Sequence, residues 1–384
     1  MREFTLEIFE EQLTRQVVHM DQGVCYNPEF RATRRMHDYP SRKLQIARAV
    51  YKGELEPSEY AADIVFSAIL SGQGERWQNF GEDPYEYTLV SMLCREMLLK
   101  KGVGTKYAKA LLDLLKKNDG HIADVSEYAS AWQEAMPVSG ESGAYLCLDD
   151  ATAALVPHCA RGLGDLFRRR GMEFQGGIGP AFAGYEYFAY GLIDEGIAHL
   201  KGWVEALKSG GIDTVVTLSG QTETVFRLLM PAVGIAHGFR VKNVLDFLSP
   251  TRMPQPAYAY AGSFYARALR RDGVINALLP NKDERHAAWS GEFNPMLEAD
   301  NRVNTVTKWQ PPVCPEFAAP GLDEALLDRI REDAVAQIGL SGASLTVVFD
   351  PHAYHALHES GCRGRVAYFA ELMWPGMEKT VGLL

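Results

Sequence analysis

The sequence predicts an α/β protein in which a helical N-terminal domain is followed by two tandem α/β units with parallel sheets. Two observations lead to this fold class. Residues 1–120 place apolar side chains at helical spacing. From residue 140 onward, short β-rich runs alternate with longer helical patterns, which is typical of βαβ units. The expected domains are 1–135, 140–250 and 251–384.

Three helices are expected in the N-terminal domain. The first covers 41–55, where Leu44, Ala47 and Val50 lie close to helical spacing and Ser41 is a suitable N-cap. The other two cover 59–70 and 87–102, and the latter ends in Lys-Lys-Gly, a favourable C-terminus. Polar loops are expected at 20–30 and 71–84.

The first α/β unit contains a regular alternation of strands, helices and turns. In chain order we expect a strand at 143–148, a helix at 151–171, a glycine-rich loop at 175–184, a helix at 185–211, a strand at 213–218, a loop entering a helix at 219–230 and a closing segment at 241–250.

The α/β unit occurs twice. Residues 213–223 are echoed by 344–354, and residues 241–250 are echoed by 365–375. In both copies a β-rich strand runs into a polar turn and a helix, and an apolar segment then ends before proline. The same order in both places predicts tandem units.

Composition and charge narrow the class of protein. The chain has 384 residues and a net charge of -10, which argues against a nucleic-acid partner. No run approaches the ~18 apolar residues of a membrane span, and the N-terminus has no apolar signal region. The 6 cysteines are scattered, which fits a reducing compartment. We therefore expect a soluble, cytoplasmic protein.

Several segments match sequence motifs of a known family. These are Asn27-Pro28-Glu29-Phe30-Arg31, a connecting segment with Ser41-Arg42-Lys43, Ala47-Arg48-Ala49 and Gly53-Glu54-Leu55, and the run 68–79. With the two α/β units, this layout resembles the heterodisulfide-reductase family, whose relatives include the glycolate oxidase iron–sulfur subunit and an anaerobic glycerol-3-phosphate dehydrogenase subunit. The resemblance implies a helical ferredoxin-like domain with two cubane clusters, followed by two cysteine-rich CCG domains.

The ferredoxin-like ligand positions have lost their cysteines. A cubane cluster needs thiolates at short spacing, yet no two of the 6 cysteines lie within four residues of one another. The resemblance places the first four ligand positions at Val17, Met20, Gly23 and Asn27. It places the second four at Ala68, Ser71, Gly74 and Gln78. None of these side chains can hold a cubane, so we expect loops filled by side chains such as Val17, Met20 and Trp77.

The CCG-like units have also lost most of the cysteines that the family carries. In the first unit, the resemblance leaves Cys147 on the leading cysteine position. The other positions become Gly176-Gly177-Ile178 and Ser219-Gly220-Gln221-Thr222. In the second unit they become Phe264, Trp289-Ser290-Gly291 and Asp350-Pro351-His352-Ala353.

A few residues are candidates for metal binding or thiol chemistry. His352 and His355 are three apart in a predicted helix and can share a Zn²⁺ ion, while His358 is rotated too far to join. Alternatively, they are surface histidines at a helix start. Cys147 and Cys159 are either buried inert thiols or, for Cys147, a reactive thiol.

These observations lead to two functional hypotheses. The first is a non-catalytic, cluster-free structural or regulatory subunit of a heterodisulfide-reductase-like complex, with sulfur oxidation as its expected context. Its partners would be other subunits of that complex or a second copy of itself, and it would need no cofactor. The second is an enzyme or sensor that binds a small molecule or a metal such as zinc in the emptied interdomain cleft.

Overall fold

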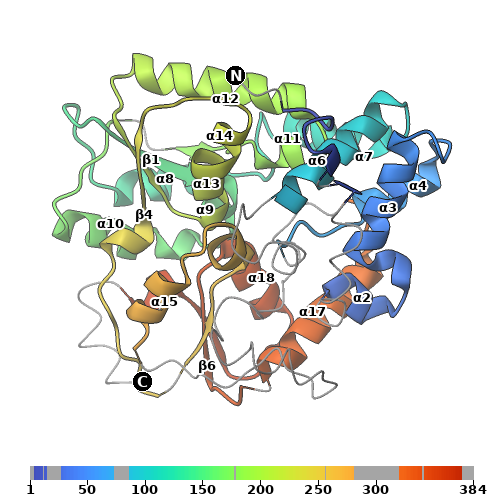
Figure 1. Ribbon diagram of the computed structural model, residues 1–384. Coiled ribbons are helices and arrows are strands. Elements are labelled where there is room, and N and C mark those ends of the chain that lie inside the picture. Colours follow the sequence, from blue (N-terminus) through green and yellow to red (C-terminus); the bar gives the residue numbers. More distant parts are fainter. Residues whose placement is uncertain are drawn as a thin grey trace.

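The structure is a computed structural model that describes residues 4–11, 13–14, 27–72, 86–176, 179–255, 257–280, 320–339 and 341–373. The fold is mixed α/β, with the described helices between residues 28 and 117 on one side and two small parallel sheets on the other (Figure 1). A search of the described helices for one long and apolar enough to cross a membrane found none.

The N-terminal region is helical, as predicted. Its elements are α2 (Pro28–Thr33), η2 (Met36–Asp38), α3 (Pro40–Tyr51), α4 (Glu59–Phe66), α6 (Glu86–Lys100), α7 (Thr105–Lys117) and α8 (Ser126–Ala135). The helices expected at 41–55, 59–70 and 87–102 correspond to α3, α4 and α6.

The ends of these helices differ from the predictions. Helix α3 begins at Pro40, so Ser41 lies in its first turn and the N-cap is Tyr39. It ends at Tyr51, because the chain turns at Gly53 with a φ of 73°. Helix α2 starts inside the expected loop 20–30, where Asn27 is the N-cap and proline occupies the first turn.

The first sheet has the strand order β2-β1-β3-β4, and every pairing is parallel. Its strands are β1 (Ala144–Asp149), β2 (Pro180–Ala181), β3 (Thr214–Thr217) and β4 (Arg240–Asn243). The helical elements around it are α9 (Asp150–Leu155), η3 (Pro157–Cys159), α10 (Ala160–Arg169), α11 (Tyr185–Ala189), α12 (Ile193–Ser209), α13 (Gly220–Thr224), η4 (Val225–Leu229), α14 (Met230–Ala232) and η5 (Val244–Phe247).

Two helices predicted as continuous are broken. The helix expected at 151–171 is interrupted at Pro157, which cannot donate the backbone hydrogen bond that a helix interior needs. The helix expected at 185–211 is interrupted near Gly191, whose φ is 79°. A side chain at Gly191 would place its Cβ 2.8 Å from the carbonyl carbon of Arg95, so the break also allows close packing on α6.

The second sheet has the parallel order β5-β6-β7. Its strands are β5 (Tyr258–Tyr260), β6 (Leu345–Val348) and β7 (Arg365–Tyr368), and its helical elements are η6 (Phe264–Ala268), α15 (Asp272–Leu278), α17 (Glu324–Gly339), α18 (Pro351–Glu359) and α19 (Phe369–Leu372). Strands β3 and β6 are each the middle of three consecutive parallel strands and each run into a helix, α13 or α18. The two strands thus have comparable neighbours in their sheets, and the expected duplication of the unit stays a prediction.

Strands β1, β3, β5 and β6 bury both of their faces. In β1, Leu146 packs with residues of α10, while the next residue, Cys147, packs with residues of α12. Burial on both faces explains the nearly continuous apolar runs of these strands. The core clusters contain residues from both sides of positions 135 and 250, so they do not mark the expected domain boundaries. These boundaries stay predictions.

Helix α17 belongs to the C-terminal part of the chain but contacts an N-terminal helix. It lies beside α2 (Figure 1), and Arg31 Nε donates to Asp333 Oδ2 at 2.7 Å. The N-terminal helical region is therefore in direct contact with a helix of the second unit.

Candidate functional site

We place the candidate site where the parallel strands end, since the carboxyl ends of such strands are the usual place for ligands in α/β proteins. In the first sheet, β1 ends at Asp149, which caps α9 by accepting from the Thr152 amide at 2.9 Å. In the second sheet, β6 leads to Asp350, which caps α18 by accepting from the Ala353 amide at 3.0 Å. Helices α9 and α18 pack against each other, so the two sheets bring these caps together.

Asp149 and Asp350 form a buried acidic pair. Asp149 is 3% exposed and Asp350 is 2% exposed. Burial, together with the negative charge of Asp149, raises the pKa of Asp350 to about 7. Burial also raises the pKa of Asp149. At neutral pH one proton is therefore exchangeable in this pair, which is what general acid–base chemistry or ligand-linked protonation requires.

Two buried tyrosines lie near the acidic pair. The Tyr265 hydroxyl donates to Asn243 Oδ1 at 3.0 Å, and Asn243 Nδ2 in turn donates to Thr217 Oγ1 at 2.9 Å. The Tyr368 side chain is fully buried, and its hydroxyl has no hydrogen-bond partner among the described residues. Burial raises the pKa of Tyr368, and the charges of Asp149 and Asp350 add to this effect. Tyr368 therefore provides a protonated donor near the carboxylates.

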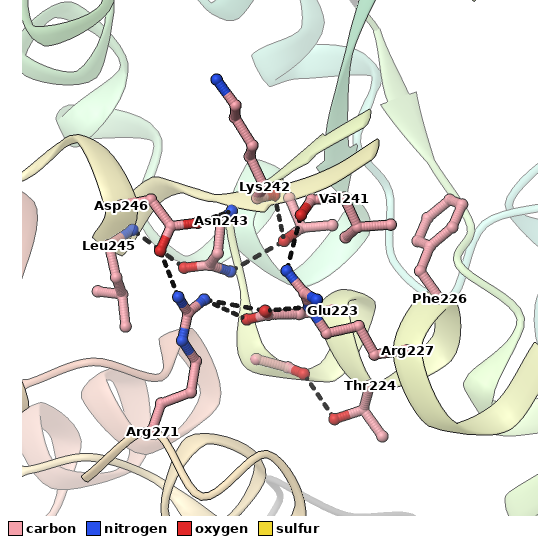
Figure 2. A network of polar contacts seen from close by, with 12 residues as sticks. Glu223, Thr224, Phe226, Arg227, Val241, Lys242, Asn243, Leu245, Asp246 and Arg271 are labelled. Carbon is pink, nitrogen blue, oxygen red and sulfur yellow. Dashed lines mark hydrogen bonds and ion pairs between the residues drawn. The ribbon is translucent and has the colours of Figure 1, made fainter. Parts of the chain in front are cut away.

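A charged network joins α13 and η5 of the first unit to Arg271, which lies between η6 and α15 (Figure 2). Its centre is Glu223 of α13, which is 1% exposed. Arg271 Nη1 donates to both carboxylate oxygens of Glu223 at 2.9 Å, and Arg227 Nε donates to Oε1 at 2.7 Å. Arg271 also binds Asp246, whose other oxygen accepts from the Asn243 amide at 2.8 Å. Both carboxylates and both guanidinium groups of this network are paired, so it stabilises the junction between the two units and holds Asn243 in place.

A second buried network surrounds residues 66–71. Glu29 Oε1 accepts from the Ile69 amide at 2.8 Å and from Lys43 Nζ at 3.2 Å. Lys43 Nζ also donates to the Ser67 carbonyl at 3.1 Å. Asn27 Nδ2 donates to the other oxygen of Glu29 at 2.8 Å. This ion pair is buried, and it fixes the backbone directly after α4.

Two buried arginines complete the contacts to the same segment. Arg95 Nη2 donates to the Ala68 carbonyl at 2.6 Å and to the Phe66 carbonyl at 3.3 Å. Arg267 of η6 donates from Nε to the Ser71 carbonyl at 2.7 Å. Residues 66–71 are thus bound by cations from α3, α6 and η6. We call this segment, with Lys43, Arg95 and Arg267, the cation-bound loop.

The described positions of the predicted lost ligands have structural contacts. Asn27 accepts from the Phe30 amide at 2.8 Å and caps α2. Ser219 accepts from the Thr222 amide at 3.2 Å and caps α13. Ala68 and Ser71 lie in the cation-bound loop, where their carbonyls accept from Arg95 and Arg267. Gly176 is described, but nothing lies within 4 Å of a Cβ placed there. The remaining positions, Val17, Met20, Gly23, Gly74, Gln78, Gly177, Trp289 and Ser290, and the expected filling residue Trp77, lie outside the described residues.

Cys147 is fully buried in β1, opposite Thr217 of β3. Burial raises the pKa of its thiol well above the ordinary value, and the charges of Asp149 and Asp150 raise it further. Since the thiolate is the reactive form, this environment favours the inert interpretation.

The two histidines of the predicted zinc site differ in exposure. His355 is exposed, while His352 is half-buried. Burial, together with the positive charge of His355, lowers the pKa of His352 to about 4. Neither belongs to a cluster of three metal-ligating side chains within the described ranges. The zinc site at these histidines stays a prediction.

Sequence reasoning did not single out the buried tyrosines, the Glu223–Arg271 pair or the cluster formed by His158, Cys159 and Glu371. Their members are far apart in the sequence: 48 residues separate Glu223 from Arg271, and 213 separate His158 from Glu371. A surface hollow of about 450 Å³ lies elsewhere, between the N-terminal segment, α6 and α12, and is lined by residues such as Phe4, Tyr51, Glu96 and Lys201.

We compared the chain with protein-family models, with curated proteins and with solved structures, and found no match. The family resemblance therefore depends on the sequence motifs.

Proposed function

We propose that this chain is a cluster-free, non-catalytic subunit of a heterodisulfide-reductase-like redox complex, with a structural or regulatory role. Under this proposal the helical region is a ferredoxin-like domain without clusters, and the two sheets belong to CCG-like units. Its partners are other subunits of the complex or a second copy of the chain, its location is cytoplasmic, and its context is sulfur oxidation.

The cation-bound loop is the observation that carries this proposal. Two of its residues, Ala68 and Ser71, are positions where the family resemblance expects cluster ligands. An iron–sulfur cluster held by four thiolates is anionic, whereas here the backbone carbonyls of these residues accept hydrogen bonds from buried Arg95 and Arg267. A carbonyl bound in this way holds the loop shape without a metal. The loop is therefore suited to preserving a docking surface after redox chemistry is lost.

The helix caps support the same proposal. Asn27, Ser219 and Asp350 occupy expected ligand positions and each accepts a hydrogen bond from a backbone amide at a helix start. Such caps contribute about 1 kcal/mol each to stability. A role in stability gives these positions a function that requires no cofactor.

The experiment is complementation of the source organism after deletion of this gene. We would express the wild-type chain or the Arg95→Met variant and measure complex assembly and turnover. In the strain that expresses Arg95→Met we expect assembly and turnover to fall together, because a structural subunit acts through assembly. Loss of turnover in a fully assembled complex would contradict the proposal.

The second candidate function is an enzyme or sensor that uses the region around Asp149, Asp350 and Tyr368. The observation in its favour is a buried carboxylate with a pKa of about 7 near a hydroxyl without a hydrogen-bond partner in the described chain. Screening small carbonyl and carboxylic compounds by thermal shift tests it. A ligand that stabilises the wild type but not an Asp350→Asn or Tyr368→Phe variant would favour this function over the structural one.

A further inference from the structure

Three metal-ligating side chains converge at the junction of η3 and α19. They are His158, Cys159 and Glu371, and one ligand atom from each lies within 4.8 Å of the other two. His158 and Cys159 are adjacent at the end of η3, whereas Glu371 comes from α19. The cluster therefore connects the first sheet's helical layer to the end of the second unit.

The spacing is close to what a tetrahedral zinc site needs. His158 Nε2 and Glu371 Oε1 are 3.3 Å apart. Two ligands at about 2.0–2.1 Å from one Zn²⁺ ion in tetrahedral geometry lie roughly 3.4 Å apart. The Cys159 sulfur needs to move inward by roughly 1 Å to reach its bonding distance of about 2.3 Å, a displacement that side-chain rotation can supply.

The charges and donor types also match this ion. One thiolate, one carboxylate and one neutral imidazole cancel the charge of Zn²⁺, so the loaded cluster is electrically neutral in a partly buried place. A sulfur ligand selects zinc over magnesium or calcium. Cys159 is a free cysteine and its side chain is buried.

The carboxylate of Glu371 is already oriented by the fold. The Tyr368 amide donates to Glu371 Oε1 at 2.8 Å, and Arg365 Nη2 lies 3.8 Å from Oε2. These partners fix the direction of the carboxylate before a metal binds. On the other side, the Tyr354 ring lies 5.7 Å from the His158 ring.

We propose that His158, Cys159 and Glu371 bind one Zn²⁺ ion that joins η3 to α19. Binding forms one bond each from His158 Nε2, Cys159 Sγ and a Glu371 oxygen, and the thiol proton of Cys159 is released to solvent. The fourth coordination position faces water, because the His158 side chain is 46% exposed. This site is independent of the proposed subunit function and differs from the zinc site predicted at His352 and His355.

Zinc titration of the metal-free full-length chain tests the site. After dialysis against a chelator, the wild type and three variants are equilibrated with Zn²⁺ at neutral pH, and bound metal is counted by elemental analysis. The variants are Cys159→Ser, His158→Ala and the control His352→Ala/His355→Ala. His158 is exposed, so its removal should leave the fold intact even where Cys159→Ser does not. Circular dichroism checks folding in each case.

We expect one tightly bound Zn²⁺ per wild-type chain and a rise of at least about 100-fold in Kd for Cys159→Ser and His158→Ala, since each removes a direct ligand. The control variant should bind as the wild type does. With Co²⁺ as the probe, a thiolate-to-metal charge-transfer band should appear in the wild type and vanish in Cys159→Ser. A wild type that retains no zinc, or zinc affinity unchanged in both ligand variants, overturns the proposal. So does loss of zinc only in the control variant.

Discussion

Arg95 donates a 2.6 Å hydrogen bond to the carbonyl oxygen of Ala68, and its side chain is fully buried. It also donates to the carbonyls of Phe66 and Ala189. One cation thus holds the end of α4, the cation-bound loop and the end of α11 together. Gly191 allows this arrangement, because its lack of a side chain lets the chain pass against the Arg95 backbone.

Replacement of Arg95 with methionine should therefore destabilise the protein strongly. The variant leaves buried carbonyls without their donor, and each such group costs about 1–3 kcal/mol. We expect the free energy of unfolding, measured by urea titration, to fall by about 3 kcal/mol or more. Arg329→Met is the matched control, because Arg329 is exposed on α17. A loss below about 1 kcal/mol for Arg95→Met would show that the loop does not depend on this cation.

The Glu223–Arg271 pair should show strong energetic coupling. Breaking a buried ion pair by removing one partner costs about 3–5 kcal/mol. A double-mutant cycle with Glu223→Gln and Arg271→Met should give an interaction energy above about 1 kcal/mol. The exposed pair Asp165–Arg168 is the control and should give less than that. Equal coupling in the two pairs would mean that Glu223 and Arg271 do not hold the two units together.

Stability should depend on pH through Asp350. The folded chain keeps a proton on Asp350 up to about pH 7, whereas the unfolded chain releases it near pH 4. The folded state therefore binds more protons in this window, and the free energy of unfolding falls as pH rises from about 4 to about 7. One such group contributes a slope of at most about 1.4 kcal/mol per pH unit.

The Asp350→Asn variant isolates this effect, because asparagine can still cap α18. Urea titrations between pH 5 and pH 8 should give a flatter profile for the variant than for the wild type. Asp323→Asn alters an exposed cap of α17, where Oδ1 accepts from the Leu326 amide at 2.7 Å. This control should keep the wild-type slope. Parallel profiles for the wild type and Asp350→Asn would contradict the buried acidic pair.

Cys147→Ser should affect stability only. The serine hydroxyl at this fully buried position lacks a prepared partner, and the cost should be about 1–3 kcal/mol. We expect the folded variant to assemble into its complex and to support normal pathway turnover in a complemented strain. A well-folded variant that assembles but abolishes turnover would show that Cys147 carries chemistry.

Local sequence patterns predicted the elements whose structure depends on neighbouring residues. The apolar runs around Leu146, Val216 and Val347 predicted β1, β3 and β6, because strands buried on both faces need such runs. The helix expected after the polar turn at 350–354 is α18, and Asp350 caps it.

The rest depends on contacts between distant residues. Helix 59–70 was expected to reach residue 70, but α4 stops at Phe66 because Lys43, Arg95 and Glu29 bind the backbone that follows. The opposite charges at Glu223 and Arg271 had no visible relation in the sequence. Buried ionisable groups of this kind are recognised only once the fold has brought them together.

Iron and acid-labile sulfide analysis of the anaerobically purified chain tests the central proposal most directly. The cation-bound loop and the capped positions offer carbonyls, amides and hydroxyls instead of thiolates, and no two cysteines in the sequence lie within four residues of each other. We expect a colourless protein without iron or sulfide. About four irons per chain with matching sulfide, the content of one cubane cluster, would contradict the proposal that this chain has kept the family frame without its clusters.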